Sequence, residues 1–493
     1  MSIKESMSIP GAPASKPKDR SPWLFDLLLI VVLIGAAAFR FMGSNWGELN
    51  IQHPDEDFMT SVTYDIAPVQ TLGQYFNTAT STLNPYNRGY SFYVYGDLPL
   101  ILTRYLADWT QQLNNVRQFG REISAAMDLL TVALLYFLAK RLYGSRTAIL
   151  AALFSACAVM EIQQSHFYTS DNFVTFFMLL TLYVAVVIAT GSWQQLPDQD
   201  LRPVWRYLRR MLQDPLALLS LAFGLVLGMA AACKVNAAVL AVALPVALLI
   251  RYFRTPGEIR RRGWNSDPDF PPRLLAYLVL GGLASILSFR IFQPYAFIGL
   301  RINPQFLSNL AEVRSQSSPL ADLPWALQWA DRSHLFSLHN MVIWGLGLPL
   351  GLLAVAGFLW MGWRILKGEW QTHLLVWLYT GLYVLWQSLQ FNPTMRYELP
   401  VYPTMALLAA WLVIWLWDRG SAGLDRKPWP RLLHILSVVI GGGRGRPDHL
   451  LGDRLHRNLH PSRAAHGRFG LDLPEHPRAD QPAHPDPHGK RGQ

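Results

Sequence analysis

The chain has 493 residues, of which 51% are hydrophobic and only 15% are charged, and it contains 18 Trp, 19 Tyr and 24 Phe. This composition is too apolar and too poor in charge for an ordinary soluble domain, and it predicts a multi-pass integral membrane protein. The formal net charge of +10 does not indicate a nucleic-acid binder, because the basic residues fall in short loops between apolar runs. Cys157 and Cys233 lie in or beside apolar segments without metal-ligand spacing, so we expect buried small hydrophobic side chains.

Apolar runs of helical length recur along the chain. The first, residues 23–41, is long enough to cross a bilayer, and we expect a retained helix because no small-residue cleavage site follows it. Every run exposed to lipid must be helical, since the bilayer core offers no partner to an open backbone. The expected fold class is therefore all-α, a polytopic transmembrane helical bundle. The further runs are residues 122–139, 147–162, 172–190, 216–232, 235–250, 274–292, 341–361, 374–390 and 400–417, with a shorter one at 431–440.

Basic residues concentrate in loops that alternating helices place on one side of the membrane. The positive-inside rule assigns this side to the cytoplasm, together with the polar, Pro- and Ser-rich residues 1–21, which we expect to be disordered. The transmembrane domain is expected to span residues 22–440, with outer loops at about 43–121 and about 293–340. The basic loops contain Lys140, Arg141 and Arg146, then residues 202–210 and 251–262, then Arg364 and Lys367, then Arg426 and Lys427.

The most informative outer segment is residues 53–57, with the sequence His-Pro-Asp-Glu-Asp. It follows the first apolar run closely, so its carboxylates are either solvated loop charge or part of a site for a lipid-borne substrate at the membrane surface. Residues 64–95 are dense in Tyr, Asn and Thr and suit a re-entrant or surface-lying helix pair that roofs a cavity. Within them, Arg88 and its neighbouring tyrosines offer a cation and aromatic faces to a phosphate and a sugar, although interface anchoring explains most of the tyrosines.

Three more outer segments carry polar candidates. Asp171 is either a helix cap or a functional acid, and His166 is more often a hydrogen-bonded interfacial histidine than a ligand. Lys234 interrupts an apolar stretch, where it marks a tight outer turn, holds a phosphate, or does both. Arg396 and Tyr397 follow at the outer end of the ninth run, where an ordinary helix-end ion pair with Glu398 is the alternative to a binding role.

Carboxylates and cations gathered at an outer membrane surface suit the transfer of a group from a polyprenyl-phosphate carrier. A carboxylate would deprotonate the acceptor as general base, and the cations would stabilise the charge that develops on the leaving phosphate. The sequence has no Gly-rich phosphate loop placed to cradle a nucleotide, so a lipid-linked donor is the consistent choice.

Over residues 22–417 the sequence resembles the membrane-embedded glycosyltransferases of the GT-C superfamily, near family 39 with its protein mannosyltransferases and aminoarabinose transferases. The resemblance rests on the order and the common side of several motifs. They are Pro54-Asp55-Glu56, then Ser165-His166-Phe167 with Asp171, then Lys234, then Gln293-Pro294-Tyr295, and Arg396-Tyr397 before Pro400 and Pro403.

The resemblance implies a GT-C type bundle with outer-face loop helices, and an inverting transferase that uses a dolichyl- or undecaprenyl-phosphate sugar. Its acceptor would be a lipid, glycan or protein, at the extracytoplasmic side of the plasma (inner) membrane. Asp55 is then the catalytic base, Glu56 its neighbour or substitute, and Asp171 a second acidic group. Some relatives hold a divalent metal, which stays open as a cofactor, although this sequence has no ligand set that compels one. The candidates for binding the substrate and its phosphate are Arg88, His166, Lys234, Tyr295, Arg396 and Tyr397.

Residues 441–493 depart from the family pattern. They begin with three consecutive glycines, are rich in Arg, His and Pro, carry seven of the 13 histidines, and contain no Trp, Tyr or Ile. They form a disordered basic tail or, as we favour, a frameshift product that replaced a final helix and an outer C-terminal domain. Metal binding by the histidines is a third option.

The alternative from another function class is a secondary transporter or a flippase for lipid-linked sugars. Transporters place ionisable groups near the bilayer midplane on broken helices, often in paired halves. The sequence shows no convincing internal repeat, and its candidate residues lie at outer helix ends. Asp128 in the second run is the main exception, and we expect it to form a hydrogen bond within the bundle.

Overall fold

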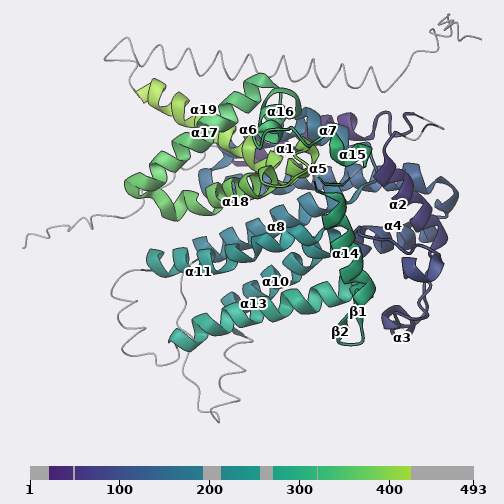
Figure 1. Cartoon of the computed structure of the whole chain (residues 1–493). Helices are drawn as coiled ribbons and strands as arrows, with labels where there is room; N and C mark the ends of the chain where they lie inside the picture. Colours follow the sequence, from purple (N-terminus) through teal and green to yellow (C-terminus); the bar gives the residue numbers. More distant parts are fainter. Residues whose placement is uncertain are drawn as a thin grey trace, which may run out of the picture.

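The protein is a bundle of long helices with smaller helices gathered at one end. The computed structural model describes residues 22–47, 50, 52–191, 213–255, 270–318, 320–321 and 323–422. In Figure 1 the long helices run side by side, and α2, α3, α4 and α14 collect at their right-hand end. Within the described residues the strands are β1 (Phe297–Ile298) and β2 (Arg301–Ile302), which form one antiparallel pair. The expected all-α fold class is confirmed.

The long helices follow the apolar runs of the sequence. Each of the ten longer runs corresponds to one helix or to two consecutive ones. The predicted run at 431–440 and the tail at 441–493 lie outside the described residues. The helices are α1 (Pro22–Phe41), α5 (Val116–Tyr143), α6 (Ser145–Ala156), α7 (Val159–Ser165), α8 (Ser170–Thr190), α10 (Pro215–Cys233), α11 (Ala243–Arg254), α13 (Phe270–Phe292), α17 (Leu348–Arg364), α18 (Trp370–Ser388) and α19 (Tyr402–Ala422), with the 3-10 segment η3 (Val235–Val242) before α11.

Eight helical stretches within the described residues are long and apolar enough to cross a membrane, or nine if α6 and α7, bent by 58°, count as one broken span. One of the eight, Leu348–Ser388, has 41 residues. An α-helix of that length would be about 60 Å long, twice the hydrocarbon thickness of a bilayer. The stretch instead turns at η6 (Ile365–Glu369), where Gly368 has a φ of 101°. Since a left-handed residue interrupts a helix, α17 and α18 are two spans joined by a tight turn.

Short elements make up one end of the bundle, here called the outer end because the predicted outer loops form it. From the first outer loop come α2 (Pro54–Asp65), α3 (Leu72–Phe76), η1 (Pro85–Arg88), α4 (Asp97–Trp109) and η2 (Leu113–Asn115). Later segments add η4 (Pro294–Ala296), α14 (Pro304–Gln316), α15 (Pro324–Leu327), α16 (Phe336–Asn340), the π-helical turn η5 (Met341–Gly345) and the 3-10 segment η7 (Met395–Val401). A small core that includes Leu83, Tyr93, Leu100 and Tyr295 holds the two loops together. Residues 64–95 are thus a folded surface layer of short helices.

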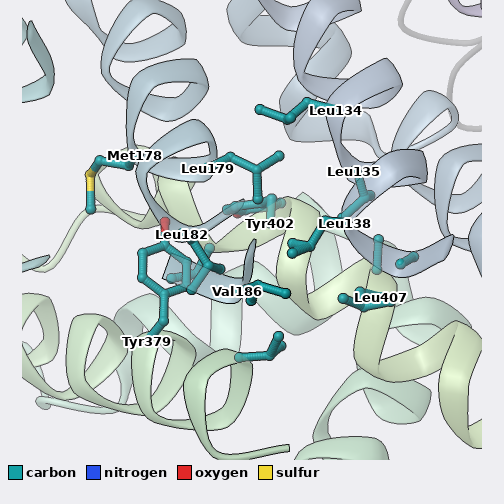
Figure 2. Packing of buried hydrophobic residues seen from close by; sticks show 14 of the residues in the cluster. Leu134, Leu135, Leu138, Met178, Leu179, Leu182, Val186, Tyr379, Tyr402 and Leu407 are labelled. Atoms are coloured by element: carbon teal, nitrogen blue, oxygen red, sulfur yellow. The ribbon is translucent and has the colours of Figure 1, made fainter. Parts of the chain in front are cut away.

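The main core lies between α5, α8, α18 and α19. Leu135, Leu182 and Tyr402 are among the buried side chains that meet there (Figure 2). Between α10 and α13 the backbones come closer still, because a Cβ atom added at Gly224 would lie 2.1 Å from the carbonyl oxygen of Gly281. Such small-residue contacts are typical of membrane helices, which associate by close packing rather than by exclusion of water.

Two sequence predictions about buried side chains are confirmed. Cys157 and Cys233 are both buried. Asp128 forms a hydrogen bond within the bundle, because its Oδ2 lies 2.6 Å from Nε of Arg40, and both side chains are almost fully buried. Arg40 also donates to the carbonyl oxygen of Ala156 at 3.0 Å. The charges of Arg40 and Asp128 are therefore paired with each other, as the low dielectric of the interior favours.

Candidate active site

The first turn of α2 carries three consecutive carboxylates. The helix starts here because His53 caps it, accepting a hydrogen bond at Nδ1 from the backbone N–H of Asp55 at 3.2 Å, and because Pro54 occupies the first helical position. Acidic residues in a first turn are also stabilised by the helix dipole. Successive residues of a helix point about 100° apart, so Asp55, Glu56 and Asp57 face three different environments.

Asp55 faces the interior of the outer end and is partly accessible. Its Oδ2 lies 2.8 Å from Nη1 of Arg396, and its Oδ1 accepts a hydrogen bond from the hydroxyl of Tyr95 at 2.9 Å. Burial, together with the charge of Asp55, raises the pKa of Tyr95, so this phenol stays a neutral donor. The side chain of Asp55 is 27% exposed, so a ligand can reach its carboxylate.

Glu56 points away from Asp55 and is buried. It forms a bidentate ion pair with Arg121, in which both N···O distances are 2.6 Å, and it accepts a hydrogen bond from the backbone N–H of Tyr168 at 2.9 Å. Arg121 in turn donates to the carbonyl oxygens of Ser44 and Trp46. Glu56 therefore ties the start of α2 to α5 and to the turn before α8.

Asp171 and Lys234 come together from α8 and from the end of α10. Lys234 Nζ lies 2.9 Å from Oδ1 of Asp171 and 4.3 Å from the ring centroid of Tyr397. Asp171 is buried and lies in the first turn of α8, but Thr169 is the residue at the N-cap. Lys234 sits at the turn between α10 and η3, as the sequence predicted, and it pairs with an anion as well.

Arg396 links the two carboxylates. Besides its contact with Asp55, its Nε lies 3.8 Å from Oδ2 of Asp171, and its Nη1 touches Nε2 of His53. A neutral imidazole accepts only one hydrogen bond, so Arg396 and the backbone N–H of Asp55 compete for the ring of His53. Burial, and next the charge of Arg396, lower the pKa of His53, which keeps this ring neutral beside the guanidinium.

The charges of the site balance. Asp55 and Asp171 face Arg396 and Lys234, and Asp57 pairs separately with Arg117 at 2.5 Å. Among the described residues, no group of three or more His, Cys, Asp or Glu side chains is arranged to hold a metal ion. Because two cations already neutralise the two acids, this set of residues does not fit a divalent metal.

Five predicted site residues meet in this cluster, and the other four lie elsewhere. Asp55, Asp171, Lys234, Arg396 and Tyr397 come together, and Glu56 braces the cluster from outside. The Nε of Arg88 donates to the carbonyl oxygen of Thr82 in an exposed setting. The ring nitrogens of His166 face the backbone oxygens of Ile162 and Met42. The hydroxyl of Tyr295 lies 2.8 Å from that of Ser81 in the small outer core.

The sequence analysis did not single out three residues that contact or brace the site: His53, Tyr95 and Arg121. The helix-start signature of residues 53–57 contains the signal for His53, since a polar residue before Pro and three acids is typical of a cap. Tyr95 is one of many tyrosines in its loop, so its sequence position does not distinguish it from the others. Arg121 is 65 positions from Glu56, and no local pattern relates the two.

Comparison with known proteins supports the resemblance noted in the sequence. Residues 99–197 match the family model of dolichyl-phosphate-mannose-protein mannosyltransferase, which confirms the expected resemblance over this segment. No curated protein matches the sequence.

The archaeal structures below share the fold at low sequence identity, and a bacterial one matches with a lower TM-score. The apo crystal structure of the Archaeoglobus fulgidus oligosaccharyltransferase matches with a TM-score of 0.55 at 13% identity, over 88% of this chain and 56% of that one. The same archaeal enzyme, AglB, with an inhibitory peptide and a dolichol-phosphate, matches with a TM-score of 0.54 at 14% identity, over 89% and 56%. ArnT from Cupriavidus metallidurans bound to undecaprenyl phosphate gives a TM-score of 0.43 at 15% identity, over 89% and 76%. The chain thus spans little more than half the length of the archaeal enzyme.

Proposed function

We propose that the protein is a membrane glycosyltransferase that moves a sugar from a polyprenyl-phosphate donor to a hydroxyl or amine of an acceptor. One observation carries the proposal: four ionised side chains from four separate elements meet at the outer helix ends, with Asp55 on Arg396 at 2.8 Å and Asp171 on Lys234 at 2.9 Å. The match to a family of dolichyl-phosphate-mannose-dependent enzymes supports the choice of donor.

In the proposed reaction the acceptor oxygen or nitrogen attacks C1 of the sugar while the bond from C1 to the phosphate oxygen breaks. Asp55 takes the proton of the acceptor, and the phosphate leaves on the polyprenyl chain with the electron pair of the broken bond. Arg396 and Lys234 stabilise its charge, as preorganised cations do in a site shielded from water. A single displacement of this kind inverts the configuration at C1. The acceptor is a lipid, a glycan or a protein.

The site is proposed to face the extracytoplasmic side of the plasma (inner) membrane. The basic loops support this orientation, since Lys140 and Arg141 end α5 and Lys367 lies in the turn between α17 and α18, all at the end of the bundle away from α2. Single cysteines at Ser61 and Lys367 test it in intact cells, because both native cysteines are buried. A membrane-impermeant maleimide is expected to label Ser61→Cys and to spare Lys367→Cys, and the reverse pattern would refute the orientation.

The proposed chemistry is tested by sugar transfer in proteoliposomes that contain radiolabelled polyprenyl-phosphate hexose or pentose donors. Asp55→Asn removes the base and keeps the shape, and we expect transfer to fall about 10²- to 10⁴-fold. Asp57→Asn is the matched control, because this neighbouring carboxylate pairs with Arg117 and faces away from Asp55. Equal transfer by wild type and Asp55→Asn would show that Asp55 is not the base.

Transport of a lipid-linked sugar is the second candidate function, and the buried pair of Arg40 and Asp128 favours it, since intramembrane ionisable groups often mark transport pathways. The same proteoliposomes separate the two functions. A transporter moves the labelled lipid between leaflets without breaking its sugar-phosphate bond, whereas a transferase releases the polyprenyl phosphate.

A further inference from the structure

A polar cavity lies on the side of α2 opposite Asp55. It is an open hollow with a volume of about 560 Å³, lined by α2, η2 and the beginning of α5, with Asn45 from the preceding loop. Thr60, Ser61 and Tyr64 line it from α2. In a helix these three positions lie about 140° to 240° around the axis from Asp55, so the body of α2 separates the cavity from the catalytic cluster. Its volume is within the usual range of small-molecule sites.

Four side-chain amides contribute to the wall of this cavity. They belong to Asn45, Asn114, Asn115 and Gln118. An amide offers both donors and an acceptor, which is what a sugar hydroxyl, itself donor and acceptor, requires. Gln118 already donates one of its hydrogen bonds to Oε1 of Glu122 at 3.2 Å. Asn114 and Asn115 are exposed on η2 and make no side-chain hydrogen bond to the described part of the chain. Their polar groups are therefore available to a ligand.

The charges of the cavity argue against a phosphate. Arg117 and Arg121 both line it, but Asp57 neutralises the first at 2.5 Å and Glu56 the second at 2.6 Å. Asp65 adds a carboxylate to the wall. The three carboxylates of Asp57, Glu56 and Asp65 thus outnumber the two cations, which disfavours an anion, whereas a neutral polyhydroxyl compound can bond to the exposed amides and hydroxyls.

We propose that this cavity is a carbohydrate-binding site, separate from the site of sugar transfer, that holds a neutral sugar unit of a glycan. The four side-chain amides that line this one hollow assign the ligand class. The inference depends on the outer end of α2 and α5 alone and does not require Asp55 to be a catalytic base.

The test uses the purified full-length protein and the methyl glycosides of mannose, glucose, galactose, N-acetylglucosamine and rhamnose, observed by saturation-transfer NMR. At least one glycoside is expected to receive saturation from the wild type. Asn114→Ala and Asn115→Ala are each expected to weaken its Kd about fivefold to thirtyfold, the loss that corresponds to one or two hydrogen bonds. Asn50→Ala, a nearby exposed asparagine outside the cavity, is the matched control and should leave the Kd unchanged.

Lys234→Ala separates this cavity from the transfer site, because it alters the catalytic cluster alone. Binding that persists in Lys234→Ala and is lost in Asn114→Ala supports the proposal. Three results would overturn it: no saturation of any glycoside, loss of binding in Lys234→Ala only, or equal Kd values for the wild type and the cavity variants. None of them depends on whether the protein transfers a sugar.

Discussion

Replacing Glu56 and replacing Asp55, two adjacent carboxylates at the start of α2, are expected to affect different properties of the protein. Glu56→Ala leaves the guanidinium of Arg121, whose side chain is 4% exposed, without its counter-charge. Breaking a buried ion pair from one side costs about 3–5 kcal/mol, because the remaining charge stays in a medium of low dielectric. The backbone N–H of Tyr168 loses its acceptor as well. We therefore expect a large loss of stability.

Asp55→Asn should have a much smaller effect on stability. The side chain is partly exposed, the amide still accepts a hydrogen bond from Tyr95, and Arg396 retains Asp171 as an anionic neighbour. Partly exposed ion pairs contribute about 1 kcal/mol or less. The predicted signature is a stable protein without transfer activity for Asp55→Asn, and a destabilised protein for Glu56→Ala.

Thermal unfolding in detergent, followed by tryptophan fluorescence, measures the first property, and donor turnover at a temperature where every variant is folded measures the second. Asp57→Ala is the control for removing a carboxylate from the same turn. Replacing Glu56 and Arg121 together by Met should recover much of the stability, since it removes both charges at once. If Glu56→Ala unfolds like the wild type yet loses transfer as completely as Asp55→Asn, Glu56 acts on the substrate and the assignment of a bracing role is wrong.

Three other predictions each concern one residue. Lys234→Ala should weaken donor binding about 10- to 100-fold, since it removes a charge-assisted contact to phosphate, and an unchanged Kd for the donor would contradict this. Burial raises the pKa of Asp97 from 3.8 to about 8. Between these pH values the folded protein keeps the proton of Asp97 and the unfolded chain loses it. The contribution of Asp97 to the free energy of unfolding therefore falls as pH rises from about 4 to about 8. Asp97→Asn should flatten this slope and be more stable than wild type at pH 8, whereas parallel profiles would exclude the effect. Gly120→Ala places a Cβ 2.4 Å from the ring of Tyr168 and should destabilise by about 1–3 kcal/mol in the same unfolding assay, and a neutral result would mean that the ring moves freely.

The helical bundle was predictable because each apolar run carries its own signal. The bilayer forces every such run into a helix, so position and type follow from composition alone. The prediction was less complete where a helix departs from regular geometry. Residues 341–361, expected as one run, divide into η5 and α17, and residues 147–162 divide into α6 and α7 with a bend of 58°.

Part of the site was also predictable, because alternation of the helices assigns each polar segment to a side of the membrane. That argument brought Asp55, Asp171, Lys234 and Arg396 to the same face, and the structure places them in contact. The alternation of the helices does not predict in which direction a side chain points on that face. The bracing of Glu56 by Arg121 is a contact between distant positions, so a prediction based on neighbouring residues treats Glu56 as equivalent to Asp55.

The position of the four charged groups follows from two physical constraints that act together. Placing a charge at the centre of a lipid-exposed helix costs about 2.5–3.5 kcal/mol, so charges are tolerated mainly where helices end. Helix termini then select the sign: Asp55 and Asp171 lie in the first turns of α2 and α8, and Lys234 follows the last residue of α10. Carboxylates at two N-termini and a cation at a C-terminus meet at one level only if α10 runs opposite to α8. The antiparallel order of the spans, which the basic loops already indicate, is thus what brings the acids and the cations of this site together.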